Sequence, residues 1–107
     1  MKWIYLIFAI FFEVIATSAL KESQGFSKVT PSIIVLVGYS LTFYFMSLTL
    51  KEMSVGVTYA IWSGMGILLI SLIGYFRYNQ VLDSAAILGM SFIAIGIIIL
   101  RFFSKSI

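Results

Sequence analysis

Four long apolar runs constrain the fold of this chain more than any other feature. They cover residues 3–20, 32–50, 55–76 and 84–103. A helix needs roughly 20 residues to cross a hydrocarbon core of about 30 Å, so each run is long enough to span a membrane. The runs do not alternate apolar with polar residues, as the strands of a membrane β-barrel do. The sequence therefore predicts an all-α integral membrane protein with four transmembrane helices, forming a single transmembrane domain over residues 1–107.

Composition indicates an integral, multi-pass membrane protein, which we expect in the cell membrane, inner or plasma. Hydrophobic residues make up 62% of the chain, charged residues only 10%, and the mean hydropathy is +1.12. A soluble domain is far less apolar. The alternative of a cleaved secretory signal at the N-terminus is disfavoured, because its apolar region would contain Glu13.

Several classes of partner are excluded by what the sequence lacks. The absence of cysteine removes disulfides and thiolate metal sites. The absence of histidine removes the commonest metal ligand and general base. Basic residues occur singly at the ends of the runs, where Lys and Arg reach the lipid headgroups. We therefore expect contact with membrane lipids, no nucleic-acid partner, no metal and no cofactor.

Glu13 is the only charged residue in the interior of the four runs, near the middle of the first. An ionised carboxylate at that depth costs roughly 2.5–3.5 kcal/mol on insertion scales. No Lys, Arg or His lies in the interior of another run to pair with it. Its partner is therefore expected to be a proton or a cationic substrate. The alternative is a basic span residue of another membrane protein, which would make this chain a structural or regulatory subunit.

Small side chains share the helix face of Glu13. Ala9, Ala16 and Thr17 lie three or four residues from it and so fall on the same stripe. They would leave room beside the carboxylate for a ligand, or would let another helix approach closely. Both interpretations stay open for these residues, although a carboxylate at mid-membrane favours the pocket.

Aromatic pairs on two other runs could receive a cation. Tyr59, Trp62 and Ser63 lie on one face of the third run, too deep for an interfacial belt. A cation over an aromatic ring gains about 0.5–2 kcal/mol. Tyr39 and Phe43, four residues apart on the second run, form a further pair whose alternative role is core packing.

The fourth run carries a stripe suited to helix association. Gly89 and Gly96 are seven residues apart and therefore lie on the same face. Small residues on one stripe let two backbones meet. Four helices alone do not easily enclose a polar cavity, so we expect a homodimer assembled through this face.

Positive charge is almost evenly divided between the two sides of the membrane. Helical hairpins place four basic residues on one side and three on the other: Lys2, Lys51, Arg101 and Lys105 against Lys21, Lys28 and Arg77. The positive-inside rule needs a clear excess to set orientation. The balance favours insertion in both orientations; the alternative is a single orientation set by factors that the count omits.

Four sequence motifs, in order along the chain, resemble those of the small multidrug resistance family. They are EVIATSALK at residues 13–21, GFS at 25–27, PS at 31–32 and YAIWSGMG at 59–66. The resemblance covers essentially the whole chain. It implies a proton-coupled exporter of cations that works as an antiparallel, dual-topology homodimer, each subunit giving its membrane Glu to a shared site. By position, Glu13 matches the family's proton and substrate carboxylate, Tyr59 and Trp62 its aromatic site residues, and Gly89 and Gly96 its dimerisation helix.

The resemblance also indicates a branch of the family. Ala16 stands where guanidinium exporters typically have Trp, and with Tyr39 the chain looks like the exporters of quaternary ammonium compounds. Val81 departs from that branch, whose members often have a basic residue there. We therefore predict a multidrug efflux antiporter, not an enzyme, in which protons compete with lipophilic and quaternary ammonium cations for Glu13. The predicted substrate site comprises Glu13, Ala9, Ala16, Thr17, Tyr39, Phe43, Tyr59, Trp62 and Ser63.

Two other functions fit the sequence less well. A proton or cation channel would need a continuous polar path, whereas the runs offer only scattered Ser and Thr besides Glu13. An enzyme would need a base beside one of those hydroxyls, and no His or Lys lies within a run.

Overall fold

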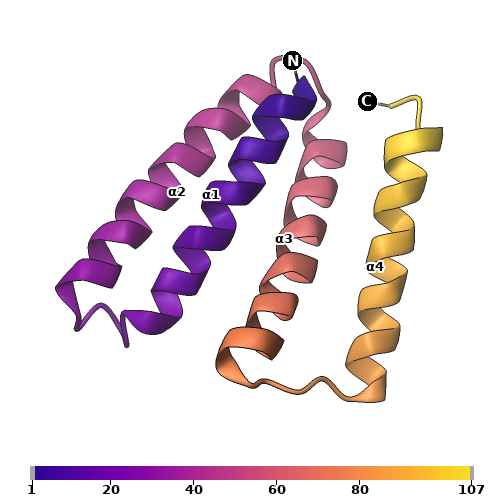
Figure 1. The fold of residues 1–107 in the computed structure, drawn as a ribbon. Helices are drawn as coiled ribbons and strands as arrows, with labels where there is room; N and C mark the ends of the chain where they lie inside the picture. Colours follow the sequence, from indigo (N-terminus) through magenta and orange to yellow (C-terminus); the bar gives the residue numbers. More distant parts are fainter. Residues whose placement is uncertain (1, 107) are drawn as a thin grey trace. The chain divides into compact units, whose positions relative to one another are not determined.

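Four helices dominate the computed structural model, which describes residues 2–106 (Figure 1). They are α1 (Lys2–Glu22), α2 (Val29–Thr49), α3 (Val55–Tyr78) and α4 (Ser84–Phe103). Each is long and apolar enough to cross a membrane. The predicted fold class, an all-α protein with four membrane-spanning helices, is confirmed.

The helix bounds agree with the apolar runs to within a few residues. α4 matches its predicted range, and α1 and α3 extend past theirs into the polar connections. α2 begins at Val29, ahead of the predicted start at residue 32. Pro31 therefore lies inside the first turn of α2, where the missing N–H of proline costs no intrahelical hydrogen bond.

The chain divides into two compact units, one formed by α1 and α2 and the other by α3 and α4. That they combine into a single transmembrane domain stays a prediction. In the first unit, α1 and α2 approach closely at Gly38. A Cβ built there would lie 2.8 Å from the Cβ of Ala16 and 3.3 Å from the carbonyl oxygen of Phe12. Only a glycine at position 38 lets the two backbones pack at this separation.

A cluster of aromatic rings adds to the packing of α1 on α2. The ring of Phe45 on α2 lies 6.5 Å from Tyr5, 5.3 Å from Phe8 and 5.8 Å from Phe12, between ring centroids. These separations fall within the range of roughly 4.5–7 Å that is typical of favourable aromatic pairs. Phe45 thus connects three rings of α1 that lie along one helix face.

A tight turn joins α1 to α2. Gln24, Gly25 and Phe26 all have a positive φ, of 49°, 72° and 64°, a region that glycine adopts freely and other residues rarely. The fully buried Ser23 holds the turn: its hydroxyl donates to the carbonyl of Leu20 at 2.7 Å and accepts from the N–H of Phe26 at 3.1 Å. These bonds offset the unfavourable backbone of the turn.

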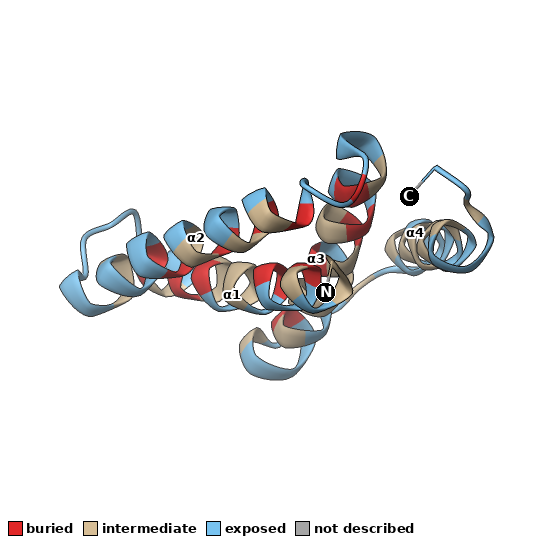
Figure 2. Cartoon of the chain, turned by 90° about the horizontal axis from the view of Figure 1, so that it is seen from above, coloured by how far each residue is buried: buried red, intermediate tan, exposed pale blue. Residues whose placement is uncertain are grey.

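In the second unit, α3 approaches α4 at Gly64. A Cβ built at Gly64 would lie 2.9 Å from Cδ1 of Ile97 and 3.2 Å from Cγ2 of Ile93. α4 itself starts at an N-cap, where the Asp83 carboxylate accepts a hydrogen bond from the N–H of Ala86 at 2.8 Å. Along its described length α4 has no buried residue, as its colouring in Figure 2 shows. One helix is thus largely uncovered within the chain.

Candidate functional site

The two carboxylate oxygens of Glu13 have different surroundings. Glu13 lies on α1 and is partly buried. Its Oε1 accepts a hydrogen bond from the hydroxyl of Thr17, one turn along the same helix, at 2.8 Å. Its Oε2 is buried and has no hydrogen-bond partner among the described residues. A buried carboxylate oxygen without a partner is costly, so Oε2 is the atom at which a proton or a cation would be stabilised.

The site extends from α1 to α2 through the same hydroxyl. Thr17 Oγ1 lies 2.6 Å from the hydroxyl oxygen of Tyr39. Thr17, predicted on the Glu13 stripe, and Tyr39, predicted on the second run, are therefore brought into direct contact. The ring of Tyr39 stacks on that of Phe43 with centroids 6.3 Å apart, and Phe43 is otherwise exposed. Tyr39 of this aromatic pair is thus linked to the carboxylate of α1 through the Thr17 hydroxyl.

Ala9 and Ala16 are both fully buried. Ala16 packs directly against Gly38 of α2, which is the helix-approach role that the sequence left open for it. Substrate contact by Ala9 and Ala16 stays a prediction. Sequence analysis did not single out Gly38, although a glycine next to a predicted site tyrosine was a usable signal.

The aromatic residues of α3 form a second group. The rings of Tyr59 and Trp62 meet edge to face, with centroids 5.5 Å apart and an interplanar angle of 65°. Tyr59 is exposed, and the Ser63 hydroxyl donates to its carbonyl oxygen at 2.7 Å. The predicted face of Tyr59, Trp62 and Ser63 is thus present on one helix. This group lies in the second unit and Glu13 in the first, and their meeting in one site stays a prediction.

The glycine stripe of α4 is open. A Cβ built at Gly89 or Gly96 would meet no atom of the described residues within 4 Å outside its own helix. Neither glycine is therefore needed for packing inside the chain as described. Their role in a homodimer stays a prediction.

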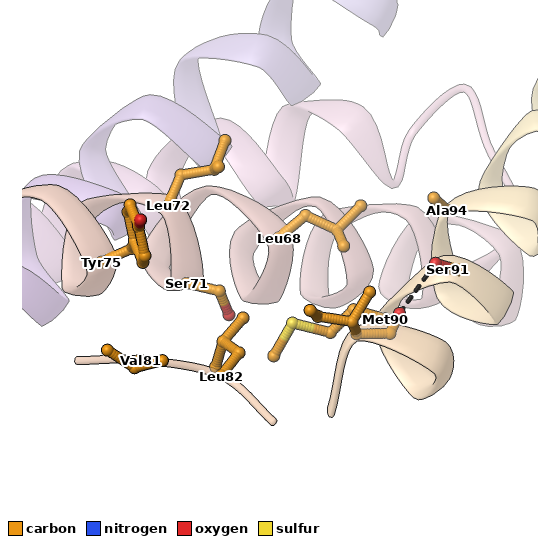
Figure 3. Close-up of a pocket in the computed structure, with 10 residues that line it drawn as sticks. Leu68, Ser71, Leu72, Tyr75, Val81, Leu82, Met90, Ser91 and Ala94 are labelled. Atoms are coloured by element: carbon orange, nitrogen blue, oxygen red, sulfur yellow. Dashed lines mark hydrogen bonds between the residues drawn. The ribbon is translucent and has the colours of Figure 1, made fainter. Parts of the chain in front are cut away.

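A cavity of about 430 Å³ lies between α3, α4 and their connection (Figure 3). Sequence analysis missed it, because no motif marks it. Leu68, Leu82 and Met90 contribute apolar walls, and the ten described lining residues include none of the predicted site residues. The hydroxyl of Ser91 is already donated to the carbonyl of Ile87, drawn dashed in Figure 3. With no charged residue in that lining, the cavity offers a cation no counter-charge.

Val81 also lines this cavity and is highly exposed. It is the residue at which the sequence is expected to depart from the quaternary ammonium branch. Val81 lies in the connection between α3 and α4, so the difference at this position falls on the lining of an apolar cavity.

Comparison with known proteins gives a consistent result. A family model described as Small Multidrug Resistance protein matches residues 1–93. The quaternary ammonium compound-resistance protein QacE of Escherichia coli is 48% identical over 104 residues, which are 97% of this chain and 94% of that protein. QacF of Klebsiella aerogenes, another quaternary ammonium compound-resistance protein, is 50% identical with the same coverage. The multidrug transporter EmrE of Escherichia coli K12 is 42% identical, again over 97% of this chain and 94% of that protein.

Sequence, fold and relatives lead to one assignment. The four helices can each cross a membrane, and both the family model and the relatives cover most of the chain. This multi-pass protein of the cell membrane therefore belongs to the small multidrug resistance family of transporters.

Proposed function

We propose that this protein is a proton-coupled antiporter that exports lipophilic and quaternary ammonium cations, with proton and substrate competing for Glu13. The observation that carries the proposal is the buried, unpartnered Oε2 of Glu13 beside an Oε1 already held by Thr17. A proton or an organic cation supplies what that oxygen lacks. Relatives named for quaternary ammonium resistance and multidrug transport support the same substrate class.

The rest of the site would bind the organic part of the substrate. The ring pair of Tyr59 and Trp62 and the stacked pair of Tyr39 and Phe43 offer aromatic faces, which attract cations and pack against alkyl or aryl groups. Ala9, Ala16, Thr17 and Ser63 complete the proposed site. A surface of rings and small side chains, with few directional polar groups, suits a broad range of substrates.

Competition for one carboxylate accounts for exchange. A proton bound to Glu13 neutralises the carboxylate; a cation displaces that proton and pairs with the ionised form. Proton and substrate therefore exclude each other. In a homodimer two Glu13 side chains would share the site and would titrate as a coupled pair.

An antiparallel homodimer would supply alternating access. Two oppositely inserted copies in inequivalent conformations can exchange those conformations, which turns the shared site from one side of the membrane to the other. The open glycine stripe and uncovered surface of α4 support association through that helix. The even division of positive charge supports insertion in both orientations.

Transport by the purified full chain in liposomes tests the proposal. With an acidic lumen, a radiolabelled tetraalkylammonium compound should accumulate inside, and a protonophore should abolish the accumulation. Glu13→Gln, which keeps the shape of the side chain but cannot ionise, should transport nothing. Uptake driven by membrane potential without a proton gradient would indicate a channel, and proton-driven uptake by the Gln variant would remove Glu13 from the mechanism.

A further inference from the structure

A directed chain of hydrogen bonds runs from α2 to one oxygen of Glu13. The Thr17 hydroxyl carries a single proton and donates it to Glu13 Oε1 at 2.8 Å. It can therefore only accept from Tyr39, whose hydroxyl lies 2.6 Å away. The order of donation is Tyr39 to Thr17 to Glu13, and each bond polarises the next.

The register of α2 against α1 sets up this chain. Ala16 and Thr17 are neighbours on α1, and Gly38 and Tyr39 are neighbours on α2. Because Gly38 lacks a Cβ, its backbone sits directly against Ala16, and this contact brings the next residues, Thr17 and Tyr39, within hydrogen-bond distance. A Cβ at position 38 would lie 2.8 Å from the Cβ of Ala16, so the helices would have to separate.

We infer that Thr17 is a positioning residue, held by Tyr39, which occupies Oε1 of Glu13 and so directs both the exchanging proton and the substrate cation to Oε2. This inference rests on the proposed function of Glu13. A donor on a carboxylate favours its ionised form. Thr17 therefore sets the pH at which the proton gives way to the cation, and Tyr39 acts on that pH through Thr17.

Few other groups of the first unit act on this carboxylate. α2, the helix packed against α1, has no charged side chain between Val29 and Thr49. Its titratable group that faces Glu13 is Tyr39. The charged residues of α1 itself, Lys2, Lys21 and Glu22, lie at its ends. The second Glu13 of the proposed homodimer is present in every variant compared, so a shift in pH dependence after a change at Thr17 or Tyr39 reports on the hydrogen-bonded chain.

The test is the pH midpoint of tetraalkylammonium binding to the purified full chain in detergent. Thr17→Val removes the hydroxyl and keeps the shape; its midpoint should move to higher pH by about one unit, the size expected for losing a hydrogen bond to a charged group. Tyr39→Phe should move it in the same direction by less. Thr17→Ser, the matched control, keeps the donor and should leave the midpoint in place.

Two further variants separate positioning from direct contact. Because Tyr39 acts through Thr17, the Thr17→Val/Tyr39→Phe double variant should show no larger shift than Thr17→Val alone. Gly38→Ala leaves both hydroxyls in place but disturbs their register, and it should raise the midpoint as well.

The results that would overturn the role of Thr17 or Tyr39 differ from the result that would overturn the proposed function of Glu13. An equal loss of affinity at every pH, without a shift of the midpoint, would make Thr17 a packing or substrate-contact residue and overturn the inference. Additive shifts in the double variant would overturn the role of Tyr39. If the original chain itself binds the cation independently of pH, the proposed function of Glu13 fails, whatever the variants do.

Discussion

Glu13 and Thr58 each bury a polar atom that has no hydrogen-bond partner among residues 2–106, yet the two differ in what they can do. The carboxylate of Glu13 can take up a proton or pair with a cation, which relieves the cost of burial. The Thr58 hydroxyl is neutral and fully buried, so neither route is open to it. The first is a candidate binding group, and the second is expected to cost stability.

Thr58→Val should stabilise the protein. Valine has the same shape and removes a buried hydroxyl whose desolvation costs about 1–3 kcal/mol when it is unpaired. The midpoint of thermal unfolding in detergent should therefore rise. Thr42→Val is the matched control, since Thr42 is equally buried but donates to the Gly38 carbonyl at 2.9 Å. Its midpoint should stay the same or fall.

The opposite result would be informative. If Thr58→Val lowers the unfolding midpoint as much as Thr42→Val does, the Thr58 hydroxyl has a partner in the assembled protein. If it weakens substrate binding instead, Thr58 supports the proposed site residue Tyr59, which follows it on α3.

At the scale of the helices, hydropathy predicted the number and the approximate bounds of the apolar helices, but not how the helices contact one another. The bounds of α4 are those of its apolar run. α2 begins three residues before its run, at Val29, because Pro31 is tolerated in the first turn of a helix. The bond between Thr17 and Tyr39 could not be predicted in this way. Periodicity assigns residues to a face of their own helix, whereas this bond depends on the register between two helices, which the Gly38 contact with Ala16 determines.

Sequence spacing also does not predict which glycines contact another helix. Gly64 packs against Ile93 and Ile97 of α4, whereas Gly89 and Gly96 lie open, although all three are glycines in apolar helices. Sequence spacing placed Gly89 and Gly96 on one stripe but could not say which helix would meet them. The structure leaves that stripe available to a second copy of the chain.

Gly89→Leu and Gly96→Leu should each lower the dimer content in detergent without preventing folding. Each added side chain meets open space within the chain, but it would block the close approach of two backbones. Ser91→Leu adds similar bulk on the opposite face of α4, beside the apolar cavity that Ser91 lines, and should leave dimers intact. Crosslinking in detergent measures the difference. Unchanged dimers in both glycine variants would mean that the stripe serves another contact.

At the scale of the whole molecule, the division of Lys and Arg between the two sides of the membrane affects the orientation in which each copy inserts. The chain carries seven Lys and Arg residues and no cysteine, so its orientation can be measured with introduced thiols. Four basic residues on one side against three on the other give almost no bias. This balance favours insertion of the same chain in both orientations, which the proposed antiparallel homodimer needs.

Single cysteines at Gln80 and Ser106 should each be labelled from both sides of the membrane. Gln80 lies in the connection before α4 and Ser106 after it, so they mark opposite ends of one helix, and neither change alters the charge. Adding Lys residues to one set of connections should force a single orientation and abolish transport, which an oppositely biased copy should restore. Labelling of each cysteine from one side only, in the original chain, would contradict dual insertion.

Binding of a tetraalkylammonium compound against pH, for the purified full chain in detergent, tests the central claim most directly. If proton and cation compete for Glu13, affinity should be full at high pH and weaken as pH falls, approaching about tenfold per unit for each proton displaced. Glu13→Gln should not bind the cation at any pH, and Glu13→Asp should bind with a displaced midpoint. Affinity that does not change with pH in the original chain would contradict the account.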